Sequence, residues 1–205
     1  MSGYEDDDRD DIEDLDDPVD DYDDLHGDIV IDDYDDLDDA DDDNDDYEDA
    51  SPEEIDFVIA LYKEDGEPVA VALAKPLAND LEDLIEQLRR LPGDAGACAF
   101  VSIASEFFVA VRVRGPNVQV LLNDSVAGAD WPIARDALDF LGMEPPEDEE
   151  SDVVGDLNML ADQGLSELDM EAIAGDYDED SGDLVRQIVK HLGYERQVEA
   201  ALSDE

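Results

Sequence analysis

Two arginines on one predicted strand are the residues whose type and spacing could do chemistry. In the segment FFVAVRVRG, Arg112 and Arg114 alternate with Val111 and Val113, so the period-two geometry of a strand places both guanidinium groups on one face. Guanidinium donors match carboxylates and phosphates, and the pair could therefore bind an anionic ligand or form a small basic spot. From the sequence alone we favour the simpler interpretation, in which both arginines are solvated.

Three tyrosines form the second candidate set. Tyr22 and Tyr34 lie within DDYDDL motifs and Tyr47 within DDYED, at spacings of 12 and 13 residues. Residues 1–52 hold 28 acidic residues and one basic residue. Such a segment cannot bury enough apolar area to offset chain ordering, so we expect a disordered tail. Low-complexity expansion explains the repeats most simply. The alternative is a set of acidic-aromatic segments that bind a basic surface.

The charge of the whole chain narrows the choice of partners. The net charge is −53, and residues 53–143 contribute −9 of it and residues 144–205 contribute −17. An acidic surface repels the phosphate backbone, so we expect no direct binding to nucleic acid. It favours encounters with basic proteins instead.

The sequence offers no set of residues for catalysis. It contains neither a glycine-rich nucleotide loop nor a GxSxG element. Residues 176–187 resemble a calcium loop, but Ser181 stands where the loop needs glycine and Gln187 where it needs glutamate. Cys98 is the single cysteine and lies in an apolar run, which favours a buried core thiol. We predict a protein that is not an enzyme, with no catalytic residue, cofactor or metal.

Alternating and helical patterns indicate the elements that would position these residues. The clearest strand pair spans 106–124, with a turn at Gly115-Pro116-Asn117. Further strands are expected at 55–63, 68–74 and 97–104. Helices are expected at 80–91, with Asn79 as N-cap, and at 130–141, with Asp130 as N-cap.

The element order ββαβββα predicts an α+β fold with a mainly antiparallel five-stranded sheet, a layout shared by longin-like and roadblock-like domains. We expect the helices to cover one face of the sheet and to leave the other partly open.

Residues 144–205 begin as an acidic, proline-stiffened linker. Short helical patterns then follow near 157–164, 166–174, 183–192 and 195–202. They predict a small helical module that could dock on the sheet or hold a partner. The predicted division of the chain is thus 1–52, 53–143 and 144–205. A basic leader and a run of about 18 apolar residues are both missing from the sequence, so we expect a cytoplasmic protein without a membrane span.

Several segments carry a resemblance to a known family. They are IDFVIALYKEDG, LEDLIEQLRRLP, VSIASEFFVAVRVRG, LLNDSVAGADWPIARDALDFLGMEPPEDEE and GDLNMLADQGLSELDMEAIAGD. Across residues 54–202 the chain resembles the actinobacterial tRNA adenosine deaminase-associated proteins. That family is named for a gene beside the tRNA adenosine deaminase gene, so the resemblance implies a partner and transfers no catalytic residues. The chain is not itself a zinc deaminase, because His26 and His191 do not begin an H-x-E element and one cysteine cannot form P-C-x-x-C.

Two functional hypotheses follow. The first is a non-catalytic acidic accessory protein that binds tRNA adenosine deaminase, or another basic protein, and so bears on the wobble adenosine-to-inosine modification. Its candidate interaction residues are Arg112, Arg114, Tyr22, Tyr34 and Tyr47. The alternative is an anion or small-molecule sensor, or an unrecognised enzyme, that uses the sheet face near Arg112 and Arg114.

Overall fold

The computed structural model describes residues 48–93, 95–147 and 150–203, and these belong to one compact unit. The predictions for residues 1–47 of the acidic tail, including those for Tyr22, Tyr34 and Tyr47, lie outside the described residues. The last residues of the predicted tail are described, and Ala50 among them is buried and hydrogen-bonded to Asn79. The first part of the fold follows the predicted order closely. Its elements are β1 (Ile55–Glu64), β2 (Glu67–Ala72), α1 (Leu81–Arg89), β3 (Ala97–Ile103), β4 (Phe107–Arg114), β5 (Asn117–Leu122) and α2 (Pro132–Leu141).

With a short sixth strand, β6 (Val154–Gly155), these strands form an antiparallel sheet in the order β2-β1-β3-β4-β5-β6. The predicted α+β fold with its antiparallel sheet is confirmed, and one short strand is added to it. This strand, β6, pairs with Leu121 and Leu122. At Gly155 the φ angle is +106° and a Cβ atom would lie 2.2 Å from the Val120 carbonyl oxygen, so only glycine fits this pairing.

The alternation in β4 sorts its side chains onto two faces as predicted. Val109, Val111 and Val113 belong to the core between the sheet and helices α1 and α2. Phe108 and Ala110 belong to a second core on the opposite face. In this way the three valines pack together with Phe107 under one helical layer, while Phe108 and Ala110 pack under the other.

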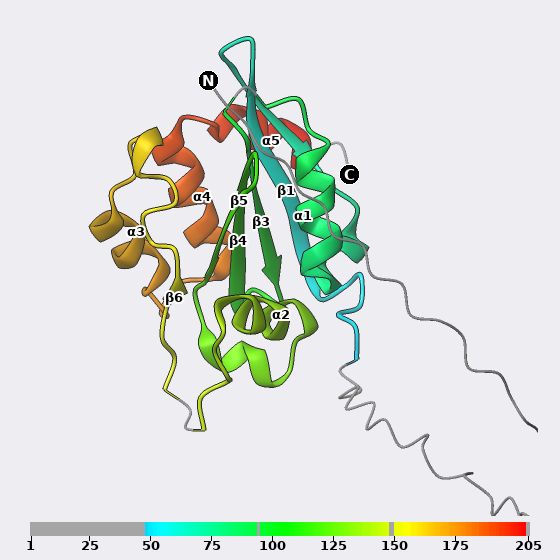
Figure 1. Ribbon diagram of the computed structural model, residues 1–205, viewed down its shortest axis with the longest axis vertical. Helices are drawn as coiled ribbons and strands as arrows, with labels where there is room; N and C mark the ends of the chain where they lie inside the picture. Colours follow the sequence, from blue (N-terminus) through cyan, green and yellow to red (C-terminus); the bar gives the residue numbers. More distant parts are fainter. Residues whose placement is uncertain (1–47, 94, 148–149, 204–205) are drawn as a thin grey trace, which may run out of the picture. The chain divides into compact units, whose positions relative to one another are not determined.

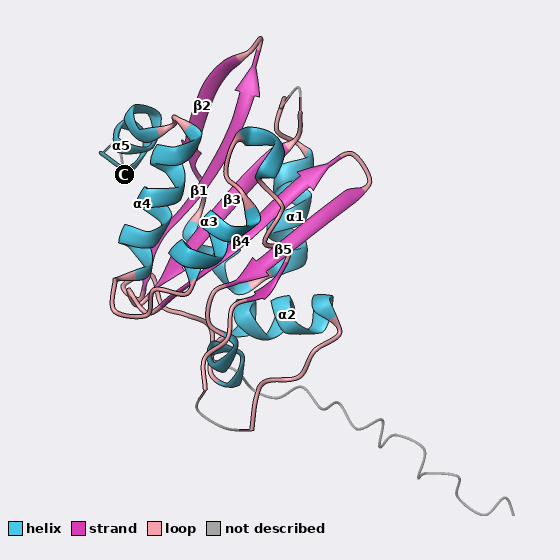
Figure 2. Ribbon diagram, turned by 90° about the vertical axis from the view of Figure 1, so that its left-hand side faces the viewer, coloured by secondary structure: helices cyan, strands magenta, loops and turns pink. Residues whose placement is uncertain are grey.

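The second face is covered by the C-terminal helices α3 (Glu167–Ala174), α4 (Ser181–Leu192) and α5 (Glu195–Ser203). Figure 1 shows α3 and α4 on one side of the sheet and α1 on the other, and Figure 2 shows α3 and α4 lying across the strands. The prediction of a partly open face is therefore wrong. The physical reason lies in β3, where every residue of ACAFVSI is buried, since a strand buried on both faces lacks polar alternation.

The helix ends agree with the sequence at some positions and correct it at others. Ser166 caps α3 by accepting a hydrogen bond from the Asp169 backbone N–H, and Gly193 ends α4 in the left-handed region, in agreement with the predicted helical ranges 166–174 and 183–192. Asp80 rather than Asn79 caps α1, because Asn79 is hydrogen-bonded to the backbone of Ala50. Trp131 rather than Asp130 occupies the N-cap position of α2.

Within the described ranges, no helix has the length and apolar character needed to cross a bilayer.

Candidate functional site

Arg112 and Arg114 meet on one carboxylate. Asp162 lies in a short 3-10 helix, η3 (Ala161–Gln163), that the C-terminal segment places over the end of β4. The Arg112 guanidinium donates to both oxygens of Asp162, with Nη2 to Oδ2 at 2.8 Å, and also to the Met159 carbonyl oxygen. Arg114 Nη1 donates to the same Oδ2 at 3.2 Å. The three side chains therefore form one ion-pair cluster that ties the second layer to the sheet.

The solvated position that we favoured for both arginines is wrong for Arg112. Only 2% of Arg112 is exposed, whereas the side chain of Arg114 is 52% exposed. Arg112 is buried because residues 157–165 pack on this face of the sheet. The sequence around β4 contains no pattern that predicts this packing. An anionic ligand at Arg112 would have to displace Asp162, so the structure offers little support for an anion site on this residue.

The electrostatics of the cluster follow from the bidentate contact. The hydrogen bond from Arg112, followed by the charges of both arginines, lowers the pKa of Asp162 in spite of partial burial. The hydrogen bond with Asp162 raises the pKa of Arg112. Both groups are thus held in their charged forms, as expected for a stabilising pair rather than for a group that exchanges protons.

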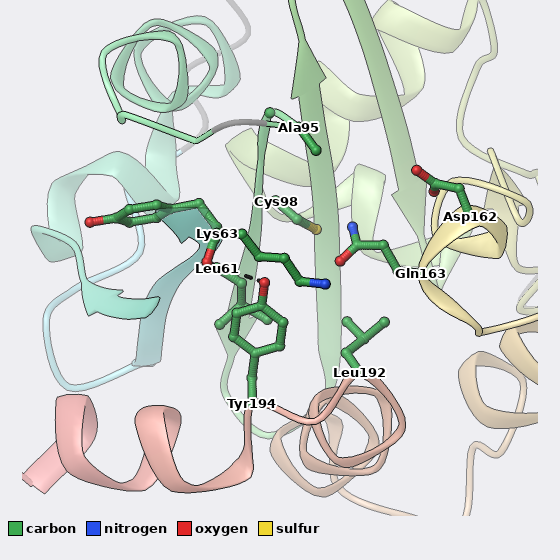
Figure 3. A pocket seen from close by; sticks show the side chains of 10 residues that line it. Leu61, Lys63, Ala95, Cys98, Asp162, Gln163, Leu192 and Tyr194 are labelled. Atoms are coloured by element: carbon green, nitrogen blue, oxygen red, sulfur yellow. Dashed lines mark hydrogen bonds between the residues drawn. The ribbon is translucent and has the colours of Figure 1, made fainter. Parts of the chain in front are cut away.

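A small cavity adjoins this cluster (Figure 3). Its volume is about 130 Å³, and its lining includes Lys63 of β1, Cys98 of β3, Gln163 of η3 and Tyr194 after α4. The Tyr194 hydroxyl donates a hydrogen bond to the Tyr62 carbonyl oxygen at 3.2 Å. Cavities that bind drug-sized ligands measure about 300–1,000 Å³. The size of this cavity fits a few water molecules better than a metabolite.

Cys98 is buried in the floor of this cavity, as the sequence predicted. Burial raises the pKa of its thiol to about 12, and the charge of Arg112 offsets only part of that effect. The thiolate, which is the reactive form, is therefore scarce at neutral pH.

Cys98 is accordingly expected to resist labelling. At pH 8 its thiolate fraction is about one in 10⁴, and Ellman's reagent should react at least ~100-fold more slowly with the native protein than with protein unfolded in guanidinium chloride. The release of the thionitrobenzoate chromophore measures both rates. Fast, complete reaction of the native protein would contradict the burial and the raised pKa.

One serine-carboxylate cluster was not predicted from the sequence. Ser102 of β3 donates to Asp56 at 2.9 Å and shares a hydrogen bond of 2.8 Å with Ser181 at the start of α4, while the Ser105 backbone N–H donates to Asp56 at 2.8 Å. A serine nucleophile needs a neighbouring base such as imidazole, and the contacts of Ser102 are a carboxylate and a hydroxyl. The cluster instead joins the β3–β4 turn to α4.

Among the residues that the structure describes, no three His, Cys, Asp or Glu side chains are grouped so that they could hold a metal ion.

Comparison with known proteins agrees with the resemblance seen in the sequence. The chain is similar to Protein Rv3753c of Mycobacterium tuberculosis, with 29% identity over 150 residues that cover 71% of this chain and 87% of that protein. No solved structure matches the chain significantly. The profile of the Rv3753c-like tRNA adenosine deaminase-associated proteins matches residues 56–195, which include all of the sheet except Ile55 and the helices α1 to α4. The chain therefore belongs to the Rv3753c-like tRNA adenosine deaminase-associated protein family.

Proposed function

We propose that the chain is a non-catalytic, acidic accessory protein that binds tRNA adenosine deaminase. The observation that carries this proposal is the match of residues 56–195 to a family described as associated with that enzyme. The buried thiol of Cys98 and the internally paired Arg112 are consistent with a binding role, because both side chains serve the packing of the fold. The proposal places the protein in the cytoplasm, where tRNA is modified.

Charge supplies the physical basis for this association. An enzyme that acts on tRNA needs a basic surface toward the phosphate backbone, and a chain of net charge −53 complements such a surface. The acidic segments around Tyr22, Tyr34 and Tyr47 are the proposed first contacts. Arg114, which is half exposed, remains able to pair with a carboxylate of the partner. Binding would shield the tRNA-facing surface, regulate access to it, or keep the enzyme soluble.

The alternative function, an anion or small-molecule sensor or an enzyme near Arg112 and Arg114, has weaker support. Helices cover that face, the donors of Arg112 already bind Asp162 and Met159, and the adjoining cavity is small.

Titration of purified deaminase with the full chain tests the proposal. We expect binding at about 50 mM salt that weakens at least ~10-fold at 500 mM salt, because charge-driven association is screened by ions. Deleting residues 1–47 should slow association by about tenfold at low salt, since it removes a net charge of −25 and keeps the Ala50 contacts with Asn79. Stopped-flow fluorescence and calorimetry measure these rates and affinities.

A triple variant, Tyr22→Ser, Tyr34→Ser and Tyr47→Ser, is the matched control because it keeps every charge. Binding equal to that of the parent chain would assign the role of the tail to charge alone. Weaker binding would support the acidic-aromatic segments. Failure of the parent chain to bind the deaminase at 50 mM salt would refute the proposed function.

A further inference from the structure

A groove runs between α1 and α2, on the face of the sheet opposite the Arg112 cluster. It has a volume of about 510 Å³ and is open to solvent. Its apolar lining comes from Leu81 and Ile85 of α1, Val118 of β5 and Phe140 of α2. The two helices are joined where the Asp136 carboxylate accepts a hydrogen bond from the Leu81 backbone N–H at 3.1 Å.

Phe140 is not needed to hold α2 on the sheet. The inner stripe of this helix consists of Ile133, Ala134, Ala137 and Leu138, all buried. Phe140 stands outside that stripe with 47% of its surface exposed, and Met143, just past the end of the helix, is 41% exposed. A large aromatic side chain left at a groove in this way is typical of a surface that buries it on binding a partner.

The rim of the groove carries an excess of negative charge. Asp80, Glu82, Asp136 and Asp139 line it together with one basic residue, Arg89. Asp139 also forms an ion pair of 3.6 Å with Arg135 on the same helix, and its side chain remains 63% exposed. Burial, and then the charges of Asp80 and Asp139, raise the pKa of Asp136 above its usual value, although the hydrogen bond from Leu81 acts in the opposite direction. A cation placed at this rim would relieve the repulsion among the carboxylates.

We propose that the α1–α2 groove is a docking surface for a basic, amphipathic segment of a partner protein. An apolar side chain of that segment packs on Phe140, and its lysines or arginines lie opposite Asp80, Asp136 and Asp139. Charge complementarity selects this occupant, because four carboxylates around an exposed aromatic ring disfavour nucleic acid and acidic peptides alike. The docking surface itself does not depend on the proposed function. If the partner is taken to be the deaminase, that identification rests on the proposed function.

A second groove, between α4 and α5, provides an internal comparison. It is smaller, at about 270 Å³, and its lining includes Arg186 beside Glu195 and Glu199. Its apolar residues, Val189, Val198 and Leu202, are more deeply buried than Phe140. This groove has two carboxylates for its one cation and no aromatic side chain, whereas the α1–α2 groove has four carboxylates for one cation and Phe140, so the second groove serves as the control site.

The first test uses a synthetic helical peptide of leucine and lysine, titrated into the isotope-labelled full chain at about 150 mM salt. We expect the largest NMR shift changes in α1, α2 and Val118. Phe140→Ala, and separately the pair Asp136→Asn and Asp139→Asn, should weaken binding about 5- to 10-fold, in line with the loss of an aromatic anchor or of two charges. The asparagine at 136 retains an acceptor for the Leu81 N–H.

Matched controls are Leu168→Ala, which alters a side chain that is 74% exposed on α3, and the pair Glu195→Gln and Glu199→Gln in the second groove. Both should bind the peptide within about twofold of the parent chain. Shift changes spread evenly over the acidic surface, or equal affinities for groove and control variants, would overturn the proposal.

Repeating the measurement with deaminase separates the two proposals. Peptide binding in the groove without deaminase binding refutes the proposed function and leaves the docking surface in place. Deaminase binding that is insensitive to Phe140→Ala and to the Asp136 and Asp139 variants shows that the enzyme docks elsewhere, and it overturns the groove as its site.

Discussion

Removing residues 156–205 is expected to abolish folding of the rest of the chain. The deletion would strip α3, α4 and α5 from the second face and expose a surface that includes Phe100 and Phe108. Each large buried side chain contributes about 1.5–3 kcal/mol, so the loss of this layer exceeds the ~5–15 kcal/mol that stabilise a typical domain. Near-UV circular dichroism and binding of the dye ANS would report lost packing and exposed apolar surface.

The control is deletion of residues 1–47, which should leave the near-UV spectrum unchanged. A truncated chain ending at 155 that remained monomeric, with a cooperative melt and no dye binding, would show that the C-terminal segment is a separable module. The predicted division of the chain at residue 144 would then describe real folding units.

Asp162→Ala is expected to destabilise the protein by about 3 kcal/mol, as measured by urea unfolding. The substitution leaves the Arg112 guanidinium, whose side chain is 3% exposed, without its carboxylate. Breaking a buried ion pair from one side costs about 3–5 kcal/mol, and the half-exposed position of Asp162 places the effect at the lower end. Arg114→Ala removes an exposed partner of the same carboxylate and should cost less than about 1 kcal/mol.

The pH dependence of this difference provides a check. Because the pKa of Asp162 is lowered in the folded protein, its contribution is present above the unfolded pKa of about 4 and is lost as the pH falls through the lower folded pKa. The stability gap between the parent chain and Asp162→Ala should therefore narrow toward acid pH. A gap that is constant from pH 7 to pH 3 would contradict the ion-pair explanation.

The sheet was predictable because its signals are local. Valine alternation in β4, the Asp65-Gly66 turn and the Gly115-Pro116-Asn117 turn each specify structure over a few residues. The two-residue strand β6 was not predictable, since its pairing depends on Gly155 fitting against Val120 rather than on a pattern. The uninterrupted apolar run of β3 indicated that both faces of the sheet are buried. It was a better guide to the covering of the sheet than the order of the elements.

The candidate site was less predictable than the fold because its partners are distant in the sequence. The position of Arg112 depends on Asp162, 50 residues further along the chain, and no spacing rule links a strand arginine to that carboxylate. The α1–α2 groove likewise depends on Phe140 of α2 lining one cavity with residues of α1. Periodicity places Phe140 outside the inner stripe of its helix but does not show what lies next to it.

The covering of the sheet by two layers has a consequence for protein synthesis. Ribosomes make the strands together with α1 and α2 first, and the segment that covers Phe100 and Phe108 emerges last. Until then the nascent chain carries an apolar face that could associate with other unfinished chains. By that stage the N-terminal segment, with a net charge of −27 over residues 1–52, has already left the ribosome, and its repulsion opposes such association while the fold is incomplete.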